Sequence, residues 1–146
     1  MRLLRTFFLF ALILLSGCAS TTPKYPGLVE PSAGKAVVYI YRVDLLAGVD
    51  DIAPNVRINF ENIGALTRNG YFRVEANPGS AQLALYKLDI GDNVFWPANK
   101  DIIVNLDMEP DNTYFVELSL NTTTISFGTT SREVALEAMP GKNLLN

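Results

Sequence analysis

Cys18 is the residue with the clearest chemical potential, because it is the only cysteine in the 146-residue chain. The chain has no histidine, so the side chain that enzymes use most often as a general base or metal ligand is missing. A lone cysteine forms no intramolecular disulfide, but it can be a free thiol, an intermolecular disulfide partner or a modification site. The residues around Cys18 decide among these roles.

The segment before Cys18 has the layout of an export signal. Two arginines form a short basic region, an apolar run spans residues 7–15, and the small residues Ser16 and Gly17 precede the cysteine. The apolar run is well short of the roughly 20 residues that cross a bilayer comfortably. We therefore expect this segment to be a signal peptide rather than a transmembrane helix.

The motif Leu15-Ser16-Gly17-Cys18 resembles the lipobox of bacterial lipoprotein signal peptides. The resemblance implies that the Cys18 sulfur receives a diacylglycerol group and that signal peptidase cleaves between Gly17 and Cys18. Two or more acyl chains give stable membrane anchoring. The alternative is an ordinary secretory signal that happens to contain a cysteine.

Ala19, directly after the cysteine, bears on the membrane that the protein occupies. Position 19 resembles the sorting position of Gram-negative lipoproteins. Aspartate there implies retention in the inner membrane, and alanine implies the default transport to the outer membrane. We expect an outer-membrane protein that faces the periplasm. In a Gram-positive cell the same chain would lie outside the plasma membrane.

The chain divides into a signal peptide (1–17), a lipidated cysteine with a flexible tether rich in Ser, Thr, Pro and Gly (18–34), and one folded domain (35–146).

Loss of Arg2 and Arg5 with the leader changes the net charge from −3 to −5. A mildly acidic domain without a Lys/Arg cluster is a poor candidate for binding nucleic acid or anionic headgroups.

Short β-branched and aromatic runs separated by turn residues fill the domain. In residues 55–60 the alternation places Val56, Ile58 and Phe60 on one buried face, and Asn69-Gly70 is a strong hairpin signal. About seven short strands predict an all-β fold, an antiparallel β-sandwich. The runs with strand character, counting the short ones at 63–66 and 123–127, are 36–42, 55–60, 63–66, 71–76, 81–88, 101–107, 113–120 and 123–127.

One short helix is predicted near the C-terminus. Thr130 and Glu133 have the spacing of a capping box, with Thr130 as the N-cap. The apolar residues Val134, Leu136 and Met139 follow, and a Pro-Gly pair ends the helix. We expect this helix to pack on a sheet edge.

Residues 35–120 resemble the DUF2846 family of uncharacterised bacterial proteins, many of which are lipoproteins. The resemblance lies in the strand 36–42, the segment 54–59 followed by Ile63-Gly64, and the run 69–74 that leads to Pro78-Gly79. It implies a sandwich with a PEGA-like or transthyretin-like layout. It implies nothing about chemistry, because these motifs are structural.

No catalytic constellation is visible in the sequence. The pair Asp50-Asp51 is typical of solvated loop carboxylates. Residues 89–93 faintly resemble a Ca²⁺ loop but lack the bidentate glutamate at EF-hand spacing, and no glycine-rich phosphate loop is present. We predict no catalytic residue, no metal and no cofactor.

Phe95 and Trp96 are the candidate contact residues, because they are aromatic residues in a polar segment. An exposed pair would form a contact patch for a protein or a glycan; the alternative is that the loop folds back and buries them.

The first functional hypothesis is a non-catalytic, lipid-anchored binding or scaffold domain with an envelope protein partner. The alternatives are an envelope enzyme or enzyme inhibitor acting on cell-wall material, and a glycan- or small-ligand-binding module.

Overall fold

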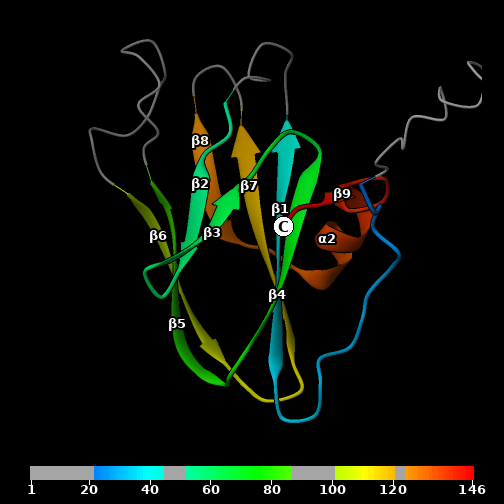
Figure 1. Ribbon diagram of the computed structural model, residues 1–146, viewed down its shortest axis with the longest axis vertical. Helices are drawn as coiled ribbons and strands as arrows, with labels where there is room; N and C mark the ends of the chain where they lie inside the picture. The colour runs from blue at the N-terminus through cyan, green and yellow to red at the C-terminus, as the bar shows by residue number, and fades with distance from the viewer. Residues whose placement is uncertain (1–21, 45–51, 87–100, 121–123) are drawn as a thin grey trace, which may run out of the picture.

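A computed structural model describes residues 22–44, 52–86, 101–120 and 124–146 (Figure 1). It contains two sheets and one short helix, α2 (Arg132–Ala138). The strands are β1 (Ala36–Asp44), β2 (Asn55–Ile58), β3 (Glu61–Ala65), β4 (Gly70–Ala76), β5 (Gly79–Tyr86), β6 (Ile102–Met108), β7 (Thr113–Leu120), β8 (Ile125–Thr129) and β9 (Asn143–Leu144).

The two sheets face one another, which confirms the predicted β-sandwich. One sheet has the order β8-β7-β1-β4-β9 and the other has the order β3-β2-β5-β6. The sandwich is not purely antiparallel, because β1 pairs with β7 in parallel and β4 pairs with β9 in parallel. The hairpin signals in the sequence specify only strands that follow one another. Pairing between distant strands depends on how the sheets pack.

The central strand β1 is buried on both faces. Ala36, Val38 and Ile40 point between the sheets, into the main core. Val37 and Tyr39 point to the outer face of the five-stranded sheet, where a second apolar cluster lies. This arrangement explains the nearly continuous apolar run of β1, since a strand covered on both sides has no polar face.

The second cluster is covered by α2 and by the segment before β1. Ala135 and Met139 pack into it from the helical side. Tyr25 packs edge-on against Tyr39 and Tyr71, with ring centroids 6.2 and 5.6 Å apart. Within the region predicted as a tether, residues 22–34 therefore lie against the domain, because the outer face of β1 and β4 is apolar and needs cover.

The helix forms where it was predicted, with a shifted start. Ser131, not Thr130, is the N-cap, and its side-chain oxygen accepts a hydrogen bond of 3.4 Å from the Val134 N–H. Thr130 instead donates its backbone N–H to the Phe115 carbonyl oxygen, which holds it in the sheet. The prediction of Thr130 as the cap is therefore wrong by one residue.

Phe60 does not belong to the core, in contrast to the prediction from alternation. Strand β2 ends at Ile58, and Asn59 and Phe60 form the turn into β3 with positive φ angles of 48° and 72°. The Phe60 side chain is 85% exposed. Alternation along 55–60 suggested a longer strand because the turn contains no glycine or proline to mark it.

Candidate functional site

The residues singled out by the sequence lie outside the described residues. This holds for the proposed lipidation and cleavage residues Gly17 and Cys18 and for the aromatic pair Phe95 and Trp96. It also holds for Asp50-Asp51 and for residues 89–93. Any candidate site within the described residues is therefore one that the sequence did not indicate.

No helix within the described part of the chain is long and apolar enough to span a membrane.

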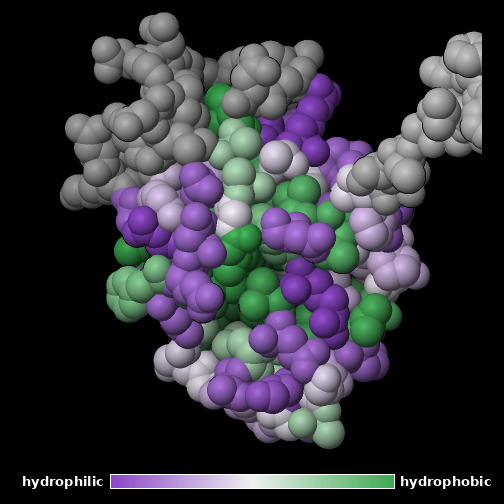
Figure 2. Space-filling model, in the orientation of Figure 1, coloured by the Kyte–Doolittle hydropathy of each residue, from purple (hydrophilic) through white to green (hydrophobic). Residues whose placement is uncertain are grey.

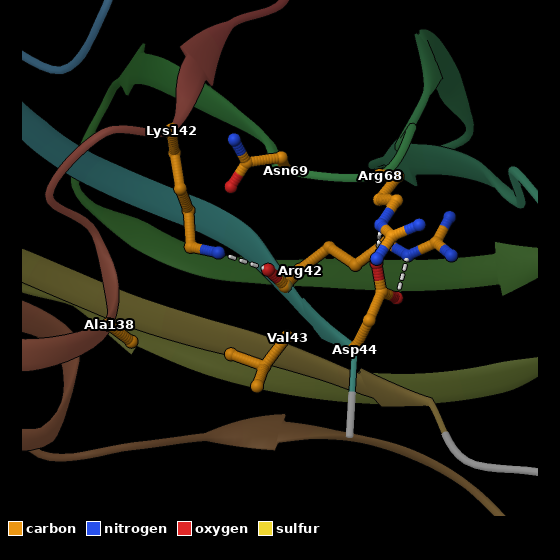
Figure 3. A pocket seen from close by; sticks show the side chains of 7 residues that line it. All are labelled: Arg42, Val43, Asp44, Arg68, Asn69, Ala138 and Lys142. Atoms are coloured by element: carbon orange, nitrogen blue, oxygen red, sulfur yellow. Dashed lines mark hydrogen bonds and ion pairs between the residues drawn. The ribbon is translucent and has the colours of Figure 1, made fainter. Parts of the chain in front are cut away.

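A polar hollow of about 430 Å³ lies at one end of the five-stranded sheet (Figure 3). Three parts of the chain meet there: the end of β1, the connection between β3 and β4, and the end of α2 with the turn that follows it. The lining residues are Arg42, Val43, Asp44, Arg68, Asn69, Ala138 and Lys142.

Arg42 is fully buried and anchors this cluster. Its Nε lies 2.6 Å from Asp44 Oδ1, and its Nη1 donates to the carbonyl oxygens of Ile52 and Leu66. Arg68 Nε approaches the other oxygen of Asp44 at 3.5 Å. A buried guanidinium is tolerated only where its donors are satisfied and a counter-charge is present, and both conditions hold here.

Lys142 enters the same hollow from the opposite side and is 7% exposed. Its Nζ donates a hydrogen bond to the Arg42 carbonyl oxygen. Burial lowers the pKa of Lys142, and the nearby carboxylates of Asp44 and Glu117 partly oppose that shift. The β1–β4 pairing ends at Tyr41 and Tyr71. The Lys142 ammonium group therefore takes the place that a backbone N–H of a neighbouring strand would have as donor to the Arg42 carbonyl oxygen.

The contacts of this polar cluster are those of a structural clamp. The hydrogen bonds and the ion pair described for Arg42 and Lys142 connect elements within the fold, and they direct positive charge inwards. In the described ranges, no three side chains of the His, Cys, Asp and Glu types come together as a metal site. The cluster holds no histidine or cysteine that would act as a nucleophile or general base.

A second hollow, of about 390 Å³, lies between the edges of β3 and β4. On this face apolar side chains lie recessed between polar ones (Figure 2). The apolar lining residues are Ile58, Ile63, Val74, Ala76 and Pro78, and Glu61 is among the polar ones. We call this hollow the edge groove. It can bind apolar groups, but it has no grouping of reactive side chains.

Phe60 stands next to residues of the edge groove and is the site residue that sequence reasoning missed. The turn Asn59-Phe60 has both residues at positive φ, the geometry in which glycine is normally preferred at the second position. A large aromatic residue there is unfavourable for the backbone and is also exposed to water. No local signal in the sequence marks this combination, because only the end of β2 at Ile58 places Phe60 in the turn.

The fold and the two hollows define a small two-sheet β-sandwich domain with a buried polar clamp and an open apolar edge. The chain belongs to the DUF2846 family, described as a protein family of unknown function, whose model matches residues 32–130. This match confirms the family resemblance seen in the strand and turn motifs. A comparison with curated proteins found no match.

Proposed function

We propose that the protein is a lipid-anchored domain of the bacterial envelope that acts by binding a partner protein and not by catalysis. The observation that carries the binding role is Phe60, a large apolar side chain that is 85% exposed in an unfavourable turn conformation. Strained residues persist where the surrounding fold holds them, and they concentrate at functional sites. Exposed aromatic residues are also enriched at the centres of protein interfaces.

The motif that ends at Cys18 supports the anchor. Lys24 already pairs with Asn143 in the fold, so at most six residues separate the anchored cysteine from the folded domain. A fully extended chain spans about 3.5 Å per residue, so this spacer reaches roughly 20 Å. The domain would thus work close to the membrane surface, with a much shorter tether than the whole segment 18–34 would give.

The anchor is tested by metabolic labelling with a radioactive or clickable palmitate analogue. We expect label on the wild-type chain and none on Cys18→Ser, which should remain as the uncleaved precursor or become soluble. Ser16→Ala is the matched control, because it keeps a small residue before the cleavage point and should label normally. Membrane fractionation of Cys18→Ser as a mature protein would disprove the proposal.

The location in the outer membrane is part of this proposal and rests on Ala19. Ala19→Asp should move the lipoprotein to the inner membrane in a Gram-negative host, as judged by density-gradient separation of the two membranes. Ala19→Ser should leave its distribution unchanged. An equal distribution of both variants would show that position 19 does not direct this protein.

The binding role is tested by affinity capture from crosslinked cells with the tagged lipoprotein. Phe60→Gly is the informative variant, because glycine relieves the positive φ and should stabilise the fold by about 0.5–1 kcal/mol. We expect it to lose the partner in spite of this gain in stability. Ile103→Thr, which removes an exposed apolar residue of β6, should keep the partner.

The pair Phe95 and Trp96 provides a second variant for the same experiment. If Phe95→Ala/Trp96→Ala loses the partner while Phe60→Gly retains it, the contact surface is the predicted aromatic loop and not the β2–β3 turn. If neither variant binds less, or if no protein is captured by the wild type, the binding role proposed here is wrong.

A further inference from the structure

Beyond Tyr71, the edge of β4 that faces away from β1 has no strand partner among the described residues. The segment before β1 lies near this edge, because Arg73 Nη2 donates a hydrogen bond of 3.2 Å to the Glu30 carbonyl oxygen. The carbonyl oxygen of Tyr71 accepts a backbone hydrogen bond of 2.9 Å from the N–H of Leu145, so its backbone groups point towards β9. Backbone direction alternates along a strand, and the backbone groups of Arg73 and Glu75 therefore point to the same edge. Among the described residues, no backbone group pairs with them.

Residues 73–75 carry a charge pattern that is complementary to itself. Arg73 and Glu75 lie opposite Tyr39 and Val37 on β1, so their side chains are on the outer face of the sheet. Between them, Val74 points inwards and lines the edge groove. When this segment is rotated about a two-fold axis at Val74, arginine faces glutamate at both ends.

We propose that a second copy of this chain pairs with the open edge of β4, antiparallel and two-fold symmetric about Val74. In this register Arg73 of one copy lies opposite Glu75 of the other. Both residues have their backbone groups directed at the partner, so the two pairs are of the hydrogen-bonded type. Within one chain Arg73 pairs with Glu75 at 3.4 Å, so in the dimer these charges would exchange an intrachain partner for one directly across two strands, a placement that favours pairing.

The same contact also covers apolar surface. The two Val74 side chains meet across the axis, each at the mouth of its own edge groove, and shield apolar groups that a single chain leaves open. An isologous contact of this kind is closed and does not propagate into fibres. An open strand edge otherwise favours uncontrolled association.

The arrangement is compatible with two membrane anchors. A two-fold axis between antiparallel strands runs perpendicular to the sheet, so the outer face of the sheet points the same way in both copies. The segment from Thr22 onwards packs on that outer face through Tyr25. Both N-terminal segments therefore start on one side, where one membrane can hold both; this last step rests on the proposed anchoring, and the pairing itself does not.

The test is disulfide trapping of the full-length lipoprotein in isolated membranes with Val74→Cys. In the proposed register Val74 of one copy lies directly opposite Val74 of the other, in a non-hydrogen-bonded pair. The two Cα atoms are then about 4.5 Å apart, a distance that suits a disulfide. Copper-phenanthroline and oxygen oxidise the two thiols to one disulfide. We expect a covalent dimer on a non-reducing gel.

Three controls give the result its meaning. Ala76→Cys lies two residues from the axis, so its two copies are about 13 Å apart along the strands and should not crosslink. Ile103→Cys is exposed on β6 and reports random collisions. The unmodified chain reports any disulfide through Cys18, and palmitate labelling of the same samples shows whether the anchor is present.

Charge exchange tests the register independently of any cysteine on the edge. Arg73→Glu should lower the dimer fraction of the detergent-solubilised protein in analytical ultracentrifugation, and Arg73→Glu/Glu75→Arg should restore it. Equal trapping of Val74→Cys, Ala76→Cys and Ile103→Cys, or a monomeric wild type that Arg73→Glu does not change, would overturn the proposal. If palmitate labelling fails while trapping succeeds, only the anchoring proposal is lost.

Discussion

The Nζ of Lys142 donates a hydrogen bond to the carbonyl oxygen of Arg42, one hundred residues earlier in the chain. The bond is buried, and it joins the turn after α2 to the last part of the central strand. It satisfies a carbonyl group that lies beyond the end of the β1–β4 pairing. The C-terminal residues are thus part of the sandwich and not an appendage of it.

Replacement of Lys142 should destabilise the fold. Lys142→Ala removes the partner of a buried carbonyl oxygen together with the packing of the lysine stem, and we expect a loss of about 1–3 kcal/mol in the free energy of unfolding. Lys35→Ala removes a half-buried lysine whose solvent-exposed Nζ hydrogen-bonds Asn77 at 2.6 Å, and it should change stability by less than about 0.5 kcal/mol. Urea denaturation of both variants gives the comparison. Equal effects would mean that the buried bond does not stabilise the fold.

Tyr25 should stabilise the domain through its ring alone. Its hydroxyl oxygen is buried and has no hydrogen-bond partner in the part of the chain that the structure describes, so Tyr25→Phe should be neutral or slightly stabilising. Tyr25→Ala removes the edge-on contacts with Tyr39 and Tyr71, and should cost about 3 kcal/mol or less. Thermal unfolding followed by circular dichroism separates the two. A Tyr25→Phe variant as unstable as Tyr25→Ala would show that the hydroxyl group has a partner, such as a bound water.

Stability should fall in alkaline solution because of Tyr41. Burial raises the pKa of Tyr41 first, and its hydrogen bond of 2.8 Å to Glu117 raises that pKa further. From about pH 10 upwards the unfolded chain loses this proton while the folded chain keeps it. The contribution of Tyr41 is therefore complete below pH 10 and is lost as the pH rises above it.

The measurement is the free energy of unfolding of the wild type and of Tyr41→Phe across this pH range. The decline should be steeper in the wild type, and the difference between the two chains should shrink as the pH rises. Lys142, whose pKa is lowered by burial, acts in the opposite sense but is present in both chains and cancels. Parallel curves would contradict the assignment to Tyr41.

Gly70 should be sensitive to even a methyl group. A Cβ atom at this position would lie 2.5 Å from Leu145 Cδ1 and 3.0 Å from the Thr67 carbonyl oxygen. Gly70→Ala should therefore displace β9 and reduce stability by about 1–3 kcal/mol. Gly128→Ala is the matched control in β8, because no atom of the described residues lies within 4 Å of its Cβ position. Hydrogen exchange at Leu144 and Leu145 should rise in Gly70→Ala and stay unchanged in Gly128→Ala.

The strand pattern was readable from the sequence because it is local. Strand β7 covers residues 113–120 as predicted, and β4, β5 and β6 differ by two residues or fewer at the ends that the structure describes. Side chains of alternating polarity and turn residues such as Asn69-Gly70 and Pro78-Gly79 act within a few positions of the chain. The two-residue strand β9 was not predicted, since a pairing of that length leaves no periodic pattern.

By itself, then, the sequence determined the sandwich class, the positions of most strands and the motif at Cys18, because alternation, turn residues and signal motifs all act over short distances. Only the tertiary structure decided the parallel pairing of β1 with β7, the packing of Tyr25 on the outer face, the bond between Lys142 and Arg42, and the exposure of Phe60. Each of these depends on which distant surfaces meet when the two sheets close. That choice follows from burial of the whole apolar surface, and no local pattern records it.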